Sequence, residues 1–476
     1  MQPTDSGRSK TFVPPLFSSS PELDRHRVAV LPFANMSPDP KDEYFADGLT
    51  EELITKLSEI SELRVIARTS IMNYKRKEKK ISEIGRELNV GSIIEGSVRK
   101  AGNKIRVTAQ LVDAKTEEHL WASNYDRELD DIFAIQSDVA SRVSGSLIGG
   151  VFANAQRKDT KDIEAYTSYM RGMQLYHEGT ESSLREAIVQ FDRAISRDPA
   201  FVRAYVGLAG VWIQLARSGY EDYSVVSGKA EVAARKALGV GPDSAEGHAI
   251  MADIHRLLDR FDESRSEAEK AIERNPNVSD AYIALGTVYS STGKLDRGLS
   301  FFQKACELDP LAFHIQEQLA WVCQLAGRED EAFEILRKLR ELYPRNPKVY
   351  DNLAGSHMME GKFAKAQEML DKGLSINPDE PALILDQGLL YALTGRRKEA
   401  EEMLQQIANS KNENVRLYGQ LHIQAALGNL DEAFKALMRQ AETHSWPFLL
   451  KSSPVLDGLR RDPRFLEFCN KVGLPP

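Results

Sequence analysis

GKLDRGLSFFQKACELDP, residues 293–310, opens with a glycine and closes with a proline, and both recur along the chain at a fixed spacing. The proline recurs at steps of 34 residues as Pro242, Pro276, Pro310, Pro344 and Pro378, with Pro199 43 residues before the series. The glycine recurs as Gly293, Gly327, Gly361, Gly395 and Gly428. A period of this size indicates one supersecondary unit copied in tandem. The back two-thirds of the chain is therefore predicted to be a stacked array, which offers an extended binding surface.

Small residues recur inside each unit where two antiparallel helices must approach closely. Twenty-four residues before the prolines are Ala252, Gly286, Ala320 and Ala354, and twelve before them are Ser264, Gly298, Ala332 and Ala366. The recurring glycine is expected to close the turn between the two helices, and the proline to stop the second helix. This pattern resembles the tetratricopeptide repeat, which implies an all-α, right-handed superhelix of helix pairs (an α-solenoid).

The array is expected to contain about eight repeats over residues 165–448, followed by a C-terminal helical cap over residues 449–476. By analogy with the repeat family, the first helix of each pair lines the concave face, where a peptide or a partner helix would bind. The side chains expected on this face are Asp253, Arg256, Ile283, Thr287, Ser290, Glu317, Trp321, Gln324, Asp351, Met358 and Met359, and the stripe continues through Leu385, Leu389 and Leu393.

The apolar members of this set have a second interpretation. Apolar residues on repeat helices more often pack between repeats than contact a ligand. The three leucines are the best candidates for burial by a neighbouring helix or by the cap. Trp321 fits both interpretations equally, and Met358 with Met359 could simply fill an irregular gap in the core.

Residues 25–150 lack the repeat pattern, and their apolar pattern predicts an α/β domain with a mixed sheet. Two apolar runs, 28–31 and 63–67, read as buried strands on either side of a helix, and strands so connected are expected to be parallel. Thr50 is the expected N-cap of that helix, which places Glu51 and Glu52 in its first turn. Residues 92–100 and 104–113 read as strands of a hairpin that turns at 101–103. A strand over 119–125 and a helix with inward residues from Ile132 to Leu147 complete the domain.

Six segments of this domain, in order, resemble the TolB-like (FlgO-like) amino-terminal domain. They are VAVLPF at 28–33, YFADGLTEEL at 44–53, RVIARTS at 64–70, IGREL at 84–88, EGSVR at 95–99, and HLWA at 119–122 with YDR at 125–127. In that family the domain commonly lies between a signalling module and tetratricopeptide repeats. The module is often a class III nucleotide cyclase, a protein kinase or a winged-helix DNA-binding domain. This sequence carries only the last two parts, so no enzymatic activity follows from the resemblance.

Composition narrows the functional classes. The 476-residue chain has a net charge of −8 and a pI near 5.8, which argues against a nucleic-acid-binding protein. Three cysteines without a CxxC motif suit a reducing compartment. Residues 1–24 are expected to be a disordered tail and 151–164 a linker. No apolar stretch is long enough to span a membrane, so we expect no integral membrane segment. We expect a cytoplasmic location.

Catalytic signatures are missing from the sequence: there is no GxxxxGK[ST], HExxH or GxSxG motif. His248 and His255, seven residues apart on one expected helix, could suggest a metal site. Core histidines are the preferred interpretation, because His255 shares its repeat position with Tyr289. The sequence therefore predicts no catalytic residue, no metal and no cofactor.

Three hypotheses for function follow. The first is a non-catalytic interaction scaffold or regulatory protein that binds a protein or peptide on the concave face of the array. The second is the regulatory segment of a nucleotide-cyclase or kinase signalling system, acting with a separate catalytic chain. The third is a small-ligand sensor that uses the front α/β domain. A cyclase, a kinase or a transcription regulator is the kind of partner that the resemblance implies.

Overall fold

The computed structural model describes residues 23–75, 77–149, 160–218, 220–221, 223–410, 413–442, 450 and 453–472. Most of the expected tail, most of the expected linker and part of the expected cap lie outside these residues. The domain boundaries drawn from the sequence stay predictions. Among the described residues, no helix combines the length and the apolar character that crossing a membrane requires.

The first part of the described chain is an α/β domain built on one mixed sheet, which confirms the predicted fold class. Its strands run in the spatial order β3-β1-β4-β5-β6, with the short β2 paired to β4. The elements are β1 (Arg27–Val30), β2 (Ala34–Asn35), η1 (Pro40–Asp42), α1 (Glu43–Ser58), β3 (Arg64–Val65), α2 (Arg68–Met72), α3 (Ile81–Leu88), β4 (Ser92–Ala101), β5 (Lys104–Asp113), β6 (His119–Glu128), η2 (Leu129–Asp131) and α4 (Ile132–Ile148).

Strand pairing follows the sequence pattern. β1 is parallel to β3, as a strand–helix–strand unit requires, and the predicted hairpin joins β4 to β5 in antiparallel register. On β5, Ile105, Val107 and Leu111 are buried, whereas Arg106 is exposed. This alternation buries one face of the sheet and leaves the other polar. The strand predicted over 63–67 is shorter than expected: β3 spans Arg64–Val65, and α2 begins at Arg68.

Helix α1 begins earlier than the sequence suggested, and this corrects the role assigned to three residues. It starts at Glu43, so Thr50 lies inside the helix and does not cap it. The Thr50 hydroxyl is buried, donates to the Ala46 carbonyl at 2.9 Å and accepts the Phe33 N–H at 3.0 Å. Glu51 and Glu52 are therefore mid-helix residues rather than first-turn acids. Thr50 was mistaken for a cap because threonine and two acids are also the usual signature of a helix start.

Sixteen helices of the described residues form eight antiparallel pairs in the tetratricopeptide arrangement, and further helices follow. We call the odd-numbered member of each pair its first helix. The pairs are α5 (Ile163–Glu178) with α6 (Glu181–Arg197), α7 (Val202–Arg217) with α8 (Tyr223–Val240), α9 (Ala245–Leu257) with α10 (Phe261–Arg274), α11 (Ser279–Ser291) with α12 (Leu295–Leu308), α13 (Phe313–Leu325) with α14 (Glu329–Leu342), α15 (Pro347–Met359) with α16 (Phe363–Ile376), α17 (Pro381–Leu393) with α18 (Arg397–Ala408), and α19 (Glu413–Ala426) with α20 (Leu430–Glu442). The helices after them are η5 (Pro454–Leu456), α21 (Asp457–Arg460) and α22 (Arg464–Val472).

The recurring glycines have the backbone conformation that the repeat requires. All five lie between the two helices of a pair with φ between 69° and 78°, in the left-handed region where a Cβ is strained. Asp259 occupies the corresponding place 34 residues before Gly293 and also has a positive φ, 55°. Aspartate tolerates this conformation better than most residues, so the turn survives there without glycine.

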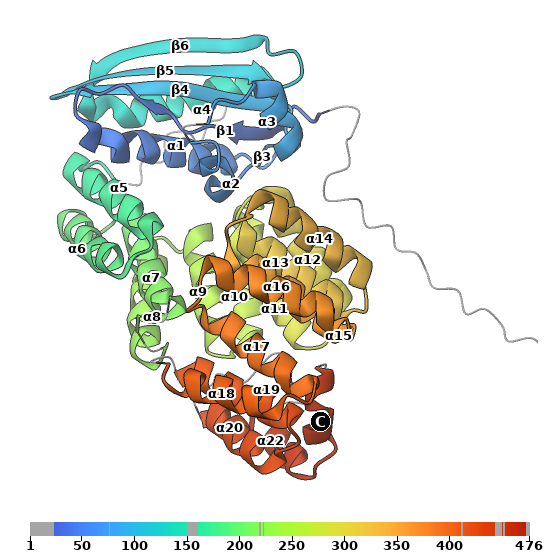
Figure 1. Ribbon diagram of the computed structural model, residues 1–476. Coiled ribbons are helices and arrows are strands. Elements are labelled where there is room, and N and C mark those ends of the chain that lie inside the picture. The colour runs from blue at the N-terminus through green and yellow to red at the C-terminus, as the bar shows by residue number, and fades with distance from the viewer. Residues whose placement is uncertain are drawn as a thin grey trace, which may run out of the picture.

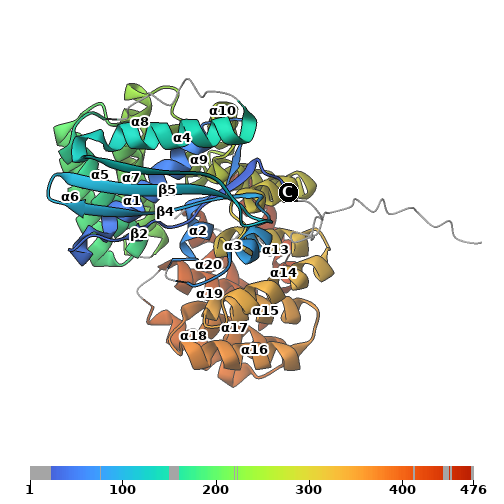
Figure 2. The ribbon, with the colours of Figure 1, turned by 90° about the horizontal axis from the view of Figure 1, so that it is seen from above.

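The α/β domain packs directly on the array. α1 and α2 lie between the sheet and the helix pairs, with β6 at the far edge (Figure 1). Seen from above, the domain leaves α15–α18 uncovered (Figure 2). Tyr166, Met170 and Leu311 of the array share one hydrophobic core with the residues buried beneath the sheet. Since burying one such side chain contributes about 1.5–3 kcal/mol, this shared core alone favours docking.

Two loops of the array hold the β3–α2 region of the α/β domain. In the loop after α10, the Asn277 side chain accepts the Val65 N–H at 3.2 Å and donates to the Leu63 carbonyl at 3.0 Å. In the loop after α12, the Asp309 carboxylate accepts the Ser70 N–H at 2.9 Å and also accepts from the Ser70 hydroxyl. Desolvation raises the pKa of Asp309 to about 7, although these two donors oppose the shift. Both residues adjoin the periodic prolines, so the loops that end the repeats also dock the front domain.

A buried ion pair completes the interface. Glu52 on α1 and Arg203 on α7 meet through two contacts of 2.6 and 2.8 Å, and their exposed fractions are only 2% and 8%. Arg203 also lies 5.2 Å from the centre of the Tyr169 ring. Because the pair is buried away from water, removal of one partner leaves the other charge buried without a counter-ion.

We expect Arg203→Met to lower the free energy of unfolding by about 3–5 kcal/mol, because Glu52 would remain buried without its cation. Urea unfolding monitored by circular dichroism measures the change. Arg185→Met is the control, since Arg185 is an exposed residue that pairs with Glu181 and Glu221, and loss of an ion pair at the surface costs about 0–1 kcal/mol. Equal losses in the two variants would contradict the assigned role of the buried pair.

Candidate partner-binding wall

The first helices of the array carry side chains that face one another from repeat to repeat. Arg217 on α7 pairs with Asp253 on α9 at 2.6 Å, and Asn352 on α15 donates to Glu317 on α13 at 2.7 Å. First helices also contact each other directly at α7–α9, α9–α11, α15–α17 and α17–α19. We call the surface formed by these side chains the inner wall.

In the N-terminal half of the inner wall, arginines of the chain itself compensate the acid Asp253. Asp253 lies between Arg217 and Arg256, which reach its carboxylate at 2.6 and 2.7 Å. Desolvation opposes ionisation, but the two guanidinium groups lower the pKa of Asp253 below its ordinary value. Because Asp253 is already paired with two cations of the chain, this half of the wall offers little attraction to a positively charged ligand.

His314 shows how closely the wall curves. It is exposed on α13, yet desolvation by the surrounding protein, together with the charge of Arg217, lowers its pKa to about 4. Arg217 lies on α7, three repeats earlier, so the first helices bend around a shared space. Asp280 on α11 also reaches solvent, and desolvation together with Asp253 raises its pKa.

The C-terminal half of the inner wall carries acids that are poorly compensated. Desolvation raises the pKa of Asp351 on α15 to about 7, and the neighbouring carboxylates of Glu317 and Glu380 add to the shift. Desolvation and the charge of Asp351 likewise raise the pKa of Asp386 on α17. One carboxylate oxygen of Asp351, Oδ1, is buried without a hydrogen-bond partner in the described part of the chain. Lys348 is the cation that partly offsets Asp351.

Within the described ranges, no group of three or more His, Cys, Asp or Glu side chains could hold a metal ion. The three cysteines are buried, and desolvation raises the pKa of the Cys306 and Cys323 thiols, which leaves them poor nucleophiles. What the wall offers instead is a set of hydrogen-bond acceptors with negative charge, which suits lysine and arginine side chains.

The residues predicted from the sequence fall into three environments. The first environment is polar contact within the wall. It includes the ion pair of Asp253 with Arg256, the hydrogen bond that Glu317 accepts from Asn352, and the hydrogen bond that Gln324 donates to Ser356 on α15. Ile283, Thr287 and Asp351 are half-buried on their first helices, and Ser290 is buried where Gly298 of the next helix approaches it. The three leucines of the continuing stripe are buried or half-buried against the array core.

The aromatic and sulfur-containing candidates divide between core and surface. Trp321 is half-buried and packs against the core of repeats four to eight. Met358 is buried in that same core, whereas its neighbour Met359 has 48% of its surface exposed. Of the two methionines, Met359 is therefore the one with surface to offer a partner.

Three residues of the inner wall were not predicted from the sequence: Asp280, His314 and Asp386. Two of them could have been found from the repeat. Asp280 and His314 occupy the same repeat position as Lys348, and polar or charged residues that recur at one position of a repeat indicate that the position faces solvent. Asp386 has no such signal. Its importance comes from the approach of α17 to Asp351, which depends on the curvature of the array.

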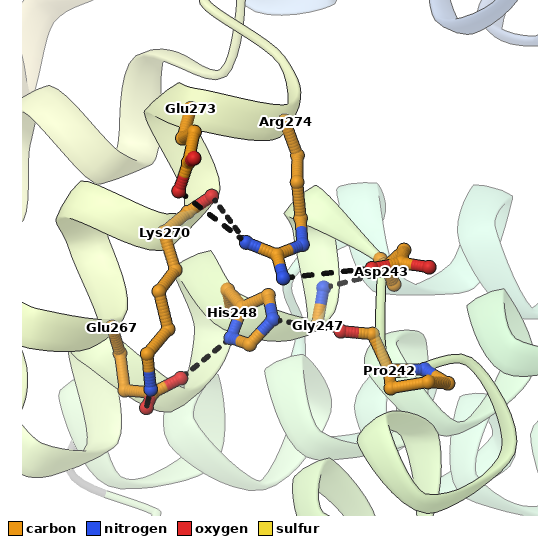
Figure 3. Close-up of polar contacts among 9 residues, drawn as sticks. Pro242, Asp243, Gly247, His248, Glu267, Lys270, Glu273 and Arg274 are labelled. Atoms are coloured by element: carbon orange, nitrogen blue, oxygen red, sulfur yellow. Dashed lines mark hydrogen bonds and ion pairs between the residues drawn. The ribbon is translucent and has the colours of Figure 1, made fainter.

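His248, a candidate metal ligand in the sequence, has a structural role. Nδ1 lies 2.6 Å from the Glu267 carboxylate and Nε2 lies 3.0 Å from the Pro242 carbonyl, so the imidazole bridges α9, α10 and the preceding loop (Figure 3). Lys270 binds Glu267 from the other side at 2.6 Å. Burial lowers the pKa of the half-buried His255.

Comparisons with protein families support the repeats and give a HilA-like match for the front domain. Tetratricopeptide-repeat models match residues 245–278, 267–299 and 357–422. Residues 24–142 match the second domain of HilA/YgeH-like transcriptional regulators. The TolB-like assignment is not confirmed by these comparisons.

Two curated relatives match part of the chain. One, named "Putative adenylate cyclase 3" from Rhizobium meliloti (strain 1021), is 40% identical over 213 residues, which cover 43% of this chain and 36% of the relative. The other, the transcriptional regulator HilA of Salmonella typhimurium, is 22% identical over 241 residues, which cover 50% of this chain and 42% of HilA. The chain thus spans well under half the length of these relatives.

Some solved structures align with half or more of this chain. Yeast Tom70 aligns with 67% of this chain and 69% of its own at 19% identity, with a TM-score of 0.41. Pseudomonas aeruginosa PilF aligns with 52% of this chain and 99% of its own at 19% identity, with a TM-score of 0.36.

The uncompensated acids predict an unusual pH dependence of stability. The folded-state pKa of Asp351, about 7, exceeds the ordinary value near 4, so the folded protein loses stability as the pH rises from about 4 through 7. Asp351→Asn removes the repulsion, and we expect it to raise the free energy of unfolding at pH 8 by on the order of 1 kcal/mol, with little change at pH 4. Urea titrations at the two pH values measure both effects.

Asp253→Asn is the matched control for this substitution. The pKa of Asp253 is lowered, so its contribution to stability is present above its unfolded-state pKa and is lost in acid. We expect Asp253→Asn to destabilise the protein at pH 8. If Asp351→Asn destabilised it at pH 8 as well, the acids of the C-terminal half would have to be compensated in a way that their contacts do not reveal.

Proposed function

We propose that this chain is a non-catalytic scaffold whose inner wall binds a partner segment, an extended peptide or a helix, that carries lysine or arginine side chains. The tetratricopeptide array indicates a protein-interaction scaffold. The observation that supports the finer proposal is the group of poorly compensated acids formed by Glu317, Asp351 and Asp386. A cationic side chain placed among them would relieve their repulsion and satisfy the free Asp351 oxygen.

The position of these acids also favours binding there. α15 and α17 lie outside the area that the α/β domain covers, so a partner can approach without displacing the domain (Figure 2). Met359 lies on α15 and the half-buried Trp321 lies on α13, the helix that carries Glu317, and both could add apolar contact. The N-terminal half, by contrast, already pairs Asp253 with its own arginines.

Substitution of the three acids by their amides tests this proposal. In cells that express the unsubstituted chain, crosslinking mass spectrometry identifies the partner peptides that are crosslinked to residues near the inner wall. We expect Glu317→Gln/Asp351→Asn/Asp386→Asn to lower the yield of those crosslinked peptides about tenfold or more, because each lost charged contact is worth about 1–3 kcal/mol.

A control variant removes the same charge from the outer surface. Glu263→Gln/Glu269→Gln/Asp296→Asn alters exposed acids on the second helices α10 and α12, none of which has an ion pair within the described residues. This variant should retain the crosslinks. Retention of the same partner at the same yield by the inner-wall triple variant would refute the proposed site.

A second function is favoured by the relative that is 40% identical over 213 residues. The chain could be the regulatory segment of a nucleotide-cyclase or kinase signalling system, acting with a separate catalytic chain. The HilA-like match of the front domain adds a transcription regulator as an alternative partner. In each case the inner wall would bind the partner. The second proposal therefore differs from the first in the identity of the partner, whereas the binding surface is the same.

The purified chain, incubated with ATP and either Mg²⁺ or Mn²⁺, is expected to form no cyclic nucleotide above the buffer blank. The reason is that the described residues present no cluster of carboxylates suited to hold a metal ion, which phosphoryl chemistry of this kind uses. Detection of cyclic AMP by mass spectrometry provides the measurement. Turnover that persists after repurification would overturn the non-catalytic assignment.

A further inference from the structure

A cavity of about 720 Å³ lies where the α/β domain meets the first helix pair. One side is formed by residues 38–44 and the hairpin turn at 100–102, and the other by α5 and α6. Its volume falls within the roughly 300–1,000 Å³ range of small-molecule sites, which occur preferentially between domains. It is remote in sequence from the acids of the inner wall, so its function can be considered separately.

Three cations line the cavity, and two of them lie over the ring of one tyrosine. The Arg171 guanidinium lies 4.9 Å from the centre of the Tyr44 ring, and the Lys100 ammonium lies 5.9 Å from it. Lys41 adds a third positive side chain to the lining. Because Tyr44 is buried, its ring is a fixed support that holds Arg171 of the array beside the α/β domain.

The acids at the cavity leave two of these cations uncompensated. Asp42 is engaged by Lys100 at 2.8 Å. Asp39 accepts the Lys41 backbone N–H at 2.9 Å and so caps the short η1 helix. Neither the Lys41 ammonium nor the Arg171 guanidinium forms an ion pair with any described residue, and both side chains are exposed. The cavity therefore has one cation from each domain available for a ligand.

We propose that this cavity binds a small anionic molecule whose phosphate or carboxylate group lies between Lys41 and Arg171. Arginine can bind either group through two parallel hydrogen bonds, and lysine contributes a point charge from the opposite domain. The side-chain amide of Gln174 lines the cavity and can donate or accept beside the anion. Gly102 has no atom within 4 Å of the place a Cβ would occupy, which leaves room for the remainder of the ligand.

Such a ligand would join the two domains. Lys41 belongs to the α/β domain and Arg171 to α5, so an anion held by both stabilises the docked arrangement and not an undocked one. A molecule that binds only the native arrangement raises the apparent stability of the protein by mass action. This effect does not depend on partner binding at the inner wall, and the two proposals can fail separately.

Thermal unfolding of the full chain tests this site with inorganic phosphate, pyrophosphate and citrate, each compared with NaCl at the same ionic strength. We expect at least one of these anions to raise the unfolding temperature by about 3 °C or more at saturation. A response to phosphate or pyrophosphate alone identifies a phosphate site, and a response to citrate alone identifies a carboxylate site. No response to any of the three beyond that to NaCl would overturn the proposal.

Two double variants locate the response. Lys41→Gln/Arg171→Gln should weaken the binding of the active anion at least tenfold in isothermal titration. Lys161→Gln/Arg193→Gln removes the same charge from exposed residues that do not line the cavity, and it should bind as the parent does. Circular dichroism shows whether each variant is folded. Unchanged affinity in a folded Lys41→Gln/Arg171→Gln variant would also overturn the proposal.

Discussion

The buried pairing of Glu52 with Arg203 is the contact on which the arrangement of the molecule depends. It joins α1 beneath the sheet to α7 of the array in a region from which water is excluded, where opposite charges attract strongly and an unpaired charge is costly. Around it, the loops after α10 and α12 bind the β3–α2 region through Asn277 and Asp309. The α/β domain is therefore held against the first four repeats. A domain fixed in this way determines which parts of the array a partner can reach.

The inner wall is divided by how its charges are compensated. Asp253 is satisfied by two arginines of the chain itself, and its contribution is stabilising. Glu317, Asp351 and Asp386 lie on successive first helices with little compensation, so at neutral pH they oppose folding. Natural proteins tolerate such local costs mainly at functional sites. This contrast distinguishes the C-terminal half of the wall as the place where a partner would supply the missing positive charge.

Much of this architecture could be predicted from local sequence. The 34-residue period identified the helix pairs, and the recurring glycines have the positive φ that their position in the repeat requires. The sheet followed from apolar runs and the hairpin turn. Contacts between distant elements could not be predicted in this way. Glu51 and Glu52 looked like helix-start acids because their partners, Arg68 and Arg203, are not neighbours in the sequence. Asp386 was missed for the same reason, and Met358 proved to be core because only packing distinguishes it from Met359.

Curvature and charge together limit the kind of partner that the proposed site on the inner wall would bind. The partner must fit the curvature that places His314 near Arg217. A flexible basic segment could adapt to that curvature, although its ordering on binding would cost conformational entropy. The acids would then act chiefly by accelerating encounter and selecting against acidic segments, effects that weaken as salt screens them. Apolar contact with Met359 and Trp321 would not be screened, so the salt dependence of binding separates the charge of the wall from its apolar surface.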